Sequence, residues 1–296
     1  MLIPTVVDQL RKARYEWRQS QGRDIHLGSR ELPSRQAVYQ IMDRLSGVLF
    51  PMRLGPPDLT KEREDHFVAY HLGKAQCQLQ EQVALELAYI DPSNTSEQER
   101  QERANTLVDG ILSQLPDLRV LLDQDVVAAY HGDPAATCVD EVLITYPGVH
   151  AVMHHRIAHV FYHAGLKIIA RIISEKAHSA TGIDIHPGAT IGRSFFIDHG
   201  TGVVIGETAI LGDRVRLYQA VTLGAVRFNE TPEGSLAKGE PRHPVVEDDV
   251  VIYAGATILG RITIGRASVI GGNVWLTRSV PAESQISQAS LRQDKD

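Results

Sequence analysis

The chain has very little cysteine, only Cys77 and Cys138 among 296 residues. Two cysteines cannot build a disulfide framework, so the sequence favours a protein of the reducing cytoplasm. No apolar run is long enough to cross a membrane, and the first residues lack the basic-then-apolar order of a signal peptide. The formal net charge of −6 argues against a nucleic-acid partner, because phosphate binding needs a basic surface. We therefore expect a cytoplasmic protein that binds neither membranes nor nucleic acid.

The first part of the chain, residues 1–179, has the spacing of amphipathic helices. One run of apolar residues recurs at three- and four-residue steps: Val38, Ile41, Met42, Leu45 and Val48. A second run, 107–115, is interrupted by Pro116. Thr95 or Ser96 follows a turn and is a suitable helix cap. The pattern predicts an α-helical domain over residues 1–179.

The second part, residues 180–283, repeats with a period of six. Aliphatic residues occupy every sixth position in two series, Ile185, Ile191, Ile197, Val203, Ala209, Val215 and Val221, then Val246, Ile252, Ile258, Ile264, Ile270 and Leu276. Neither a helix nor a flat strand has this period, whereas a β-helix of hexapeptides does. Each aliphatic residue is expected to point into the axis and stack on its equivalent one coil away.

A polar, Gly- and Pro-rich segment, residues 224–241, separates the two series. It also puts them out of phase, because the step from Val221 to Val246 exceeds a multiple of six by one. A long loop in a compact repeat is usually functional or disordered. We expect 224–241 to leave the β-helix as a loop and 284–296 to form a short polar tail.

Several short motifs lie in the repeats and just before them. They are DPAA (133–136), GVHAVMHHRIAHVFY (148–162), DIHPGATIG (184–192), IDHGTGVVIGET (197–208), QAVTLG (219–224), PRHP (241–244) and AGATILGRITIG (254–265). Together they resemble the serine O-acetyltransferases of bacteria and plants, over residues 133–281. The resemblance implies an α+β chain, with an N-terminal α-helical domain and a C-terminal left-handed parallel β-helix with three hexads per coil.

The same resemblance implies the activity. The family transfers acetyl from acetyl-CoA to the hydroxyl of L-serine, giving O-acetyl-L-serine and CoA, the first step of cysteine biosynthesis from serine. Acetyl-CoA is a co-substrate in this reaction, and no metal is expected. A serine hydroxyl is a poor nucleophile until a base removes its proton. His199 is the expected base, because histidine titrates near neutrality. Asp184, about one coil of three hexads earlier in the chain, is expected to orient the ring.

The resemblance also assigns the serine-binding residues. Asp133 and Asp198 are expected to bind the ammonium group. Arg242 and His243 are expected to bind the carboxylate, for which a guanidinium offers paired hydrogen bonds.

Three small residues, Ala225, Ala254 and Gly272, occupy positions where the family's backbone approaches the pantetheine arm of CoA. Small side chains suit such an approach. Ala225 departs from the family pattern, which often has a second glycine there.

Other functions fit parts of the sequence. Some hexapeptide β-helices bind zinc through three histidines, and His186, His199 and His243 are present, although at irregular spacings. The acceptor could instead be a sugar or another amino alcohol, or the chain could be a non-catalytic scaffold. Three further histidines lie on one face of a predicted helix, where packing is the favoured interpretation over metal binding: His155, His159 and His163.

Assembly is implied by the resemblance alone. The family forms homotrimers with the active site between neighbouring subunits, and its helical domains often join two trimers into a hexamer. Association with O-acetylserine sulfhydrylase is doubtful, because the family's tail often ends in isoleucine and this chain ends SLRQDKD.

Overall fold

A computed structural model describes residues 2–22, 32–91, 96–226 and 239–289. Most of the predicted loop (residues 227–238) and the end of the predicted tail (290–296) lie outside the described residues. None of the helices in the described ranges has the length and hydropathy needed to cross a membrane. The chain divides into two compact units, Met1–Leu32 and Pro33–Asp296. The first unit contains α1 (Leu2–Ser20), which buries no residue.

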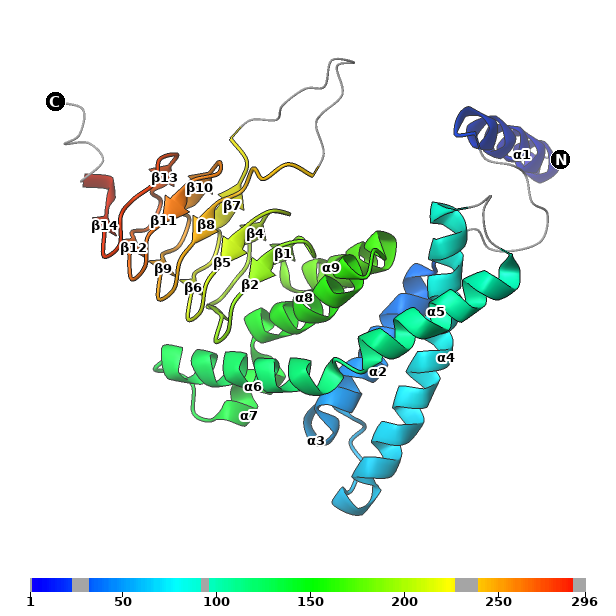
Figure 1. The fold of residues 1–296 in the computed structure, drawn as a ribbon, viewed down its shortest axis with the longest axis horizontal. Coiled ribbons are helices and arrows are strands. Elements are labelled where there is room, and N and C mark those ends of the chain that lie inside the picture. The colour runs from blue at the N-terminus through cyan, green and yellow to red at the C-terminus, as the bar shows by residue number, and fades with distance from the viewer. Residues whose placement is uncertain (1, 23–31, 92–95, 227–238, 290–296) are drawn as a thin grey trace. The chain divides into compact units, whose positions relative to one another are not determined.

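The second unit begins with packed helices (Figure 1). They are α2 (Arg35–Leu49), α3 (Pro51–Leu54), the 3₁₀ turn η1 (Lys61–Arg63), α4 (Glu64–Ile90), α5 (Glu97–Leu112), α6 (Leu115–Gly132), α7 (Val139–Thr145), α8 (Pro147–His163) and α9 (Lys167–Thr181). Ser96 caps α5 in a reciprocal capping box with Glu99. The buried carboxylate of Glu86 on α4 accepts hydrogen bonds from the first amides of α9. Gly182 ends α9 in the left-handed conformation.

Short parallel strands follow, stacked into three sheets (Figure 1). The strands are β1 (Asp184–Ile185), β2 (Thr190–Ile191), β3 (Phe196–Ile197), β4 (Val204–Ile205), β5 (Ile210–Leu211), β6 (Arg216–Leu217), β7 (Thr222–Gly224), β8 (Val245–Val246), β9 (Val251–Ile252), β10 (Thr257–Leu259), β11 (Thr263–Ile264), β12 (Val269–Ile270), β13 (Trp275–Leu276) and β14 (Gln285–Ile286). The sheet orders are β1-β4-β7-β10-β13, β2-β5-β8-β11 and β3-β6-β9-β12-β14. Successive strands change sheet, which makes a three-sided prism. The predicted α+β fold with a left-handed parallel β-helix is confirmed.

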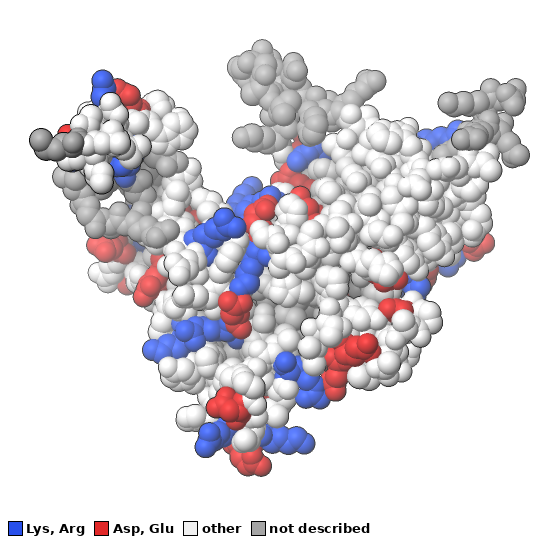
Figure 2. Space-filling model, turned by 180° about the vertical axis from the view of Figure 1, so that it is seen from behind, with Lys and Arg blue, Asp and Glu red and all other residues white. Residues whose placement is uncertain are grey.

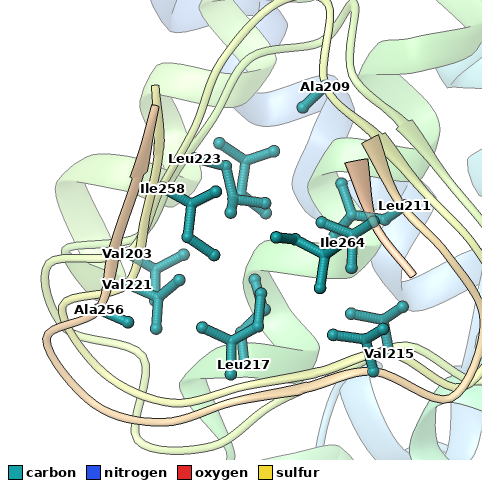
Figure 3. Packing of buried hydrophobic residues seen from close by; sticks show 14 of the residues in the cluster. Val203, Ala209, Leu211, Val215, Leu217, Val221, Leu223, Ala256, Ile258 and Ile264 are labelled. Carbon is teal, nitrogen blue, oxygen red and sulfur yellow. The ribbon is translucent and has the colours of Figure 1, made fainter. Parts of the chain in front are cut away.

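The aliphatic residues fill the axis of the prism, as the six-residue period predicts. Figure 3 shows Val203, Val221 and Ala256 in one column, and Leu223 beside Ile258 in another. Every labelled side chain in this view belongs to one buried cluster that runs through the β-helix. Apolar burial along the axis therefore stabilises the prism, since its individual strands are very short.

The first coil is slightly longer than the next, which the sequence pattern hides. Asp184 pairs with Val204, and Val204 pairs in turn with Thr222, a shorter step along the chain. Ile197 lies in a strand, but Val203 lies at the corner before the next strand. Both side chains face the axis and are buried. The six-residue series therefore continues, although its members lie in strands up to Ile197 and at corners from Val203 to Val221.

The predicted loop lengthens one coil without disturbing the pairing around it. Thr222 pairs with Thr257 across the inserted segment, and Thr257 then pairs with Trp275 over a coil of ordinary length. β14 continues the prism beyond residue 283, and α9 continues past residue 179 to Thr181. The domain boundaries at 179 and 283 stay a prediction.

Helix α8 joins the helical region to the first coil. Gly148 at its start packs so closely that a β-carbon there would lie 2.2 Å from the carbonyl oxygen of Ile197. Further along, Arg156 forms a buried, two-bonded ion pair with Asp125 of α6 and donates to the carbonyl oxygens of Ile191 and Gly192. This contact fixes the start of the β-helix, which carries several of the predicted site residues.

Candidate functional site

The predicted site residues of the β-helix lie mainly on two edges of the prism. We call the corners after β3, β6, β9 and β12 the first edge, and the corners after β1, β4, β7 and β10 the second edge. The sheet β1-β4-β7-β10-β13 separates the two edges. His199, Asp198, Ala254 and Gly272 lie on the first edge. Ala225, Arg242 and His243 lie on the second.

The first edge places three predicted residues in one column. His199, Ala254 and Gly272 occupy equivalent positions just beyond β3, β9 and β12, strands that stack in register through β6. Gln219 fills the equivalent position after β6. Two of the residues in this column are small, Ala254, which is partly exposed, and Gly272, which is exposed. The predicted base and two predicted CoA-binding residues therefore share an edge.

The corner that holds His199 is irregular because it contains the extra residues of the first coil. Backbone φ is positive at His199 (58°), Gly200 (87°) and Gly202 (80°). A β-carbon on Gly200 would lie 2.4 Å from Ile183, so the corner needs glycine there. The His199 side chain is 69% exposed, and its Nδ1 lies 3.8 Å from Oδ1 of Asp198. Positive φ recurs at other corners of the prism, for example at Arg214 (58°) and Asp249 (62°), so at His199 it belongs to the corner geometry.

Asp133 lies near His199, which makes the smallest of the contributions that lower the pKa of Asp133. Its Oδ2 accepts a hydrogen bond of 2.5 Å from the hydroxyl of Tyr146, and its Oδ1 accepts one of 2.8 Å from the amide of Ala135. These bonds, Tyr146 first, hold the pKa of Asp133 below its usual value, and Asp133 in turn raises the pKa of Tyr146 to about 12. Asp133 is therefore an ionised carboxylate beside the candidate base. Tyr146 lies outside the short motifs of the sequence, so the sequence alone could not have identified it as a partner of Asp133.

Asp184 does not stack on His199 as a coil of three hexads would require, because the longer first coil pairs Asp184 with Val204. Asp184 lies instead one coil away from the irregular corner that holds His199. The amide of Gly202 in that corner donates to the carbonyl oxygen of Gly182, which shows that the two segments are neighbours. Within the chain, ligand atoms of Asp184, Glu175 and His178 lie within 4.8 Å of one another. The described part of the chain contains no hydrogen bond between the side chains of Asp184 and His199.

The second edge brings Arg242 beside two residues that the sequence did not single out. Its guanidinium donates to Glu207 at 2.6 Å, and the other oxygen of Glu207 accepts from the Tyr162 hydroxyl at 2.7 Å. Burial raises the pKa of Glu207, but the bonds from Tyr162 and Arg242 outweigh it and hold the pKa below its usual value. Burial, with the nearby Arg242 charge, lowers the pKa of His243 to about 4, so this ring is neutral near pH 7.

The zinc alternative needs three converging histidines, and a single chain does not bring them together. His199 lies on the first edge, while His186 and His243 lie on the second. His155, His159 and His163 pack along α8, with ring centroids 5.6 and 4.2 Å apart.

Among the described residues, only Glu175, His178 and Asp184 group three possible metal ligands. There the Arg171 guanidinium already pairs with Glu175 at 2.5 Å, which disfavours a cation. The donor set does not fit a catalytic zinc site.

Comparison with known proteins identifies the family of the chain. Residues 243–278 match the model of the bacterial transferase hexapeptide (six repeats) family. The chain is 54% identical over 267 residues to a plasmid-encoded serine acetyltransferase of Synechococcus elongatus, covering 89% of this chain and 84% of that protein.

Two solved structures extend the comparison. Serine acetyltransferase 1 of Entamoeba histolytica, in complex with L-cysteine, is 37% identical with a TM-score of 0.72, covering 86% of this chain and 87% of that one. A serine acetyltransferase in complex with CoA is 27% identical with a TM-score of 0.53, covering 82% and 94%. The chain therefore belongs to the serine acetyltransferase family.

Proposed function

We propose that this chain transfers the acetyl group of acetyl-CoA to the hydroxyl of L-serine, giving O-acetyl-L-serine and CoA. The observation that carries the proposal is the composition of the first edge. His199 stands there in line with Ala254 and Gly272, and close to the carboxylates of Asp133 and Asp198. A base, the carboxylate of Asp198 for an ammonium and small residues for a thioester arm thus share one edge, and Asp133 at the end of α6 adds a second carboxylate. The reaction is the first step of cysteine biosynthesis from serine.

His199 is the base of the proposed reaction. Its imidazole takes the proton of the serine hydroxyl while that oxygen attacks the thioester carbonyl carbon. The bond between this carbon and sulfur then breaks, and the imidazolium returns the proton to the sulfur of CoA. We propose that Asp184 orients the ring, which is supported by its place one coil from the corner that carries His199. No covalent enzyme intermediate is needed, and the two cysteines take no part.

The four predicted serine-binding residues have the right charges. We propose that Asp133 and Asp198 bind the ammonium group, which is supported by their places near His199 and by the lowered pKa that keeps Asp133 ionised. Arg242 supplies a fixed positive charge and His243 a neutral ring for the carboxylate. Asp198 lies on the first edge and the Arg242–His243 pair on the second, which supports a site that two chains complete together.

We propose that the complete site forms between neighbouring chains of a homotrimer. The first edge of one chain would supply His199, and the second edge of its neighbour would supply Arg242, His243 and Ala225. Figure 2 shows a broad area of the β-helix without charged side chains. Val204 of β4 and Ile210 of β5 are exposed apolar residues on two different sheets. Such surfaces favour burial against another copy. We further propose that two trimers join through the helical residues into a hexamer.

We place the reaction in the cytoplasm. Both cysteines are free and exposed, which suits a reducing compartment.

The test of the base is the variant His199→Ala. It should lose about 10²–10⁴-fold in serine-dependent release of free CoA thiol, the usual contribution of a positioned base. The oligomer, checked by light scattering, should be unchanged because the side chain is mostly exposed. The same thiol assay with L-serine, a sugar and an amino alcohol tests the acceptor. Turnover retained by the variant, or activity on the sugar alone, would contradict the proposal.

A further inference from the structure

Arg242 and His243 rest on a short segment of the preceding coil, Gly206, Glu207 and Thr208, which we call the 206–208 cradle. Glu207 holds the guanidinium of Arg242 at 2.6 Å, and both groups are largely shielded from solvent. A carboxylate at this distance fixes the direction of a long and flexible side chain. The remaining donors of the guanidinium keep a defined direction, although Arg242 follows β7 only after the long predicted loop.

Thr208 fixes His243 in the same way and also decides which nitrogen carries its proton. The Thr208 hydroxyl oxygen accepts from the amides of Arg242 and His243, at 2.9 and 3.1 Å. The amide of Thr208 donates to Nδ1 of His243 at 3.0 Å. An amide can only donate, so Nδ1 is unprotonated and the proton of the neutral ring lies on Nε2. His243 thus carries its ring proton on Nε2, in a side chain that the fold holds in one orientation and leaves only 7% exposed.

Gly206 provides the space that this ring occupies. A β-carbon there would lie 2.0 Å from Cδ2 and 2.1 Å from Nε2 of His243. Arg261 completes the support by donating to the backbone carbonyl oxygens of Thr208 and His243, at 2.6 and 3.0 Å. Each residue of the cradle therefore has a separate contact with the 242–243 pair.

We infer that Glu207 and Thr208 are positioning residues that hold Arg242 and His243 as a preformed receptor for the carboxylate of the acceptor amino acid. The inference rests on the proposed function, in which this pair binds the serine carboxylate. A receptor fixed before the substrate arrives loses less conformational freedom on binding. It offers one permanent charge and one neutral donor, so carboxylate binding does not depend on protonation of His243.

The test compares L-serine with ethanolamine, an amino alcohol without a carboxylate, in the thiol-release assay. Glu207→Gln should raise the KM for L-serine by about tenfold with little change in kcat, as expected when ground-state binding is lost. The KM for acetyl-CoA and the rate with ethanolamine should stay the same. Thr208→Val should act in the same direction, and Thr208→Ser should restore the wild-type KM because it keeps the hydroxyl.

Asp249→Asn is the matched control. It removes a carboxylate that binds Arg214 at the same 2.6 Å, at a different corner of the prism, and should leave both acceptors unaffected. An unchanged serine KM in Glu207→Gln, or an equal loss with serine and ethanolamine, would overturn the inference. Absence of serine-dependent thiol release in the wild-type protein would instead refute the proposed function, so the two failures are distinct.

Discussion

At the scale of single residues, the buried pair of Asp125 and Arg156 has the largest expected effect on stability. Both side chains are at most 4% exposed, and Asp125 also accepts from the amide of Phe195. Asp125→Asn would leave the Arg156 charge buried without its partner, which costs about 3–5 kcal/mol. We expect urea unfolding at a fixed protein concentration to show a loss of this size in the free energy of unfolding.

The exposed pair of Arg119 and Asp123 on the same helix is the control for this prediction. Its side chains are about half exposed, so Asp123→Asn should cost less than about 1 kcal/mol. Equal losses in the two variants would show that the buried pair does not anchor the first coil.

At the scale of elements, α8 makes stability depend on pH through its histidines. Burial lowers the pKa of His154 to about 3, with a further contribution from nearby His150. The unfolded chain takes up a proton below the ordinary value of 6.5, whereas the folded chain does not until pH falls to about 3. Stability should therefore decrease as pH falls through this range, by about 1.4 kcal/mol per unit for this group.

His154→Gln tests this dependence, because glutamine can still donate to the carbonyl of His150 but takes up no proton. Between pH 6.5 and 5 the variant should lose about 2 kcal/mol less than the wild type. The comparison uses the change in the free energy of unfolding between the two pH values. Any loss of stability that the substitution causes at every pH therefore cancels. Parallel curves would show that His154 does not contribute.

The elements also show which parts of the molecule the sequence could predict. The period of six predicts the β-helix because its cause is local, one inward residue for each hexad. The longer first coil could not be predicted, since Ile197 and Val203 both face inward and keep the spacing intact. The motifs predicted the residues of both edges. Their partners Glu207 and Thr208 meet Arg242 and His243 only through strand register across a long insertion, which no local pattern reveals.

At the scale of the whole molecule, the two edges make a prediction about mixed oligomers. The substitution His199→Ala removes the proposed base from the first edge and leaves the second edge intact. The substitution Arg242→Ala removes the guanidinium from the second edge and leaves the first edge intact. Each trimer that contains both variants has one interface among three where an intact first edge meets an intact second edge. Random mixing in equal amounts should therefore restore about one quarter of the wild-type sites in the whole population and about one third in the mixed trimers.

Co-expression of the two variants with different tags, followed by the thiol-release assay on doubly tagged protein, measures this recovery. Each variant alone should stay inactive, because every interface then lacks the same group. Mixed protein with no more activity than either parent would show that both groups come from one chain.

The corners of this prism differ in length while the strands between them keep their pairing. The corner with His199 holds a short insertion, and the corner before Arg242 holds a long one. After these insertions, β4 still pairs with β1 and β8 still pairs with β5. Scaffold and reactive surface can therefore diversify separately in evolution, because insertions at corners leave the axial packing untouched. An engineer who wishes to change the acceptor has the same freedom, and can exchange corner segments as modules without redesigning the interior.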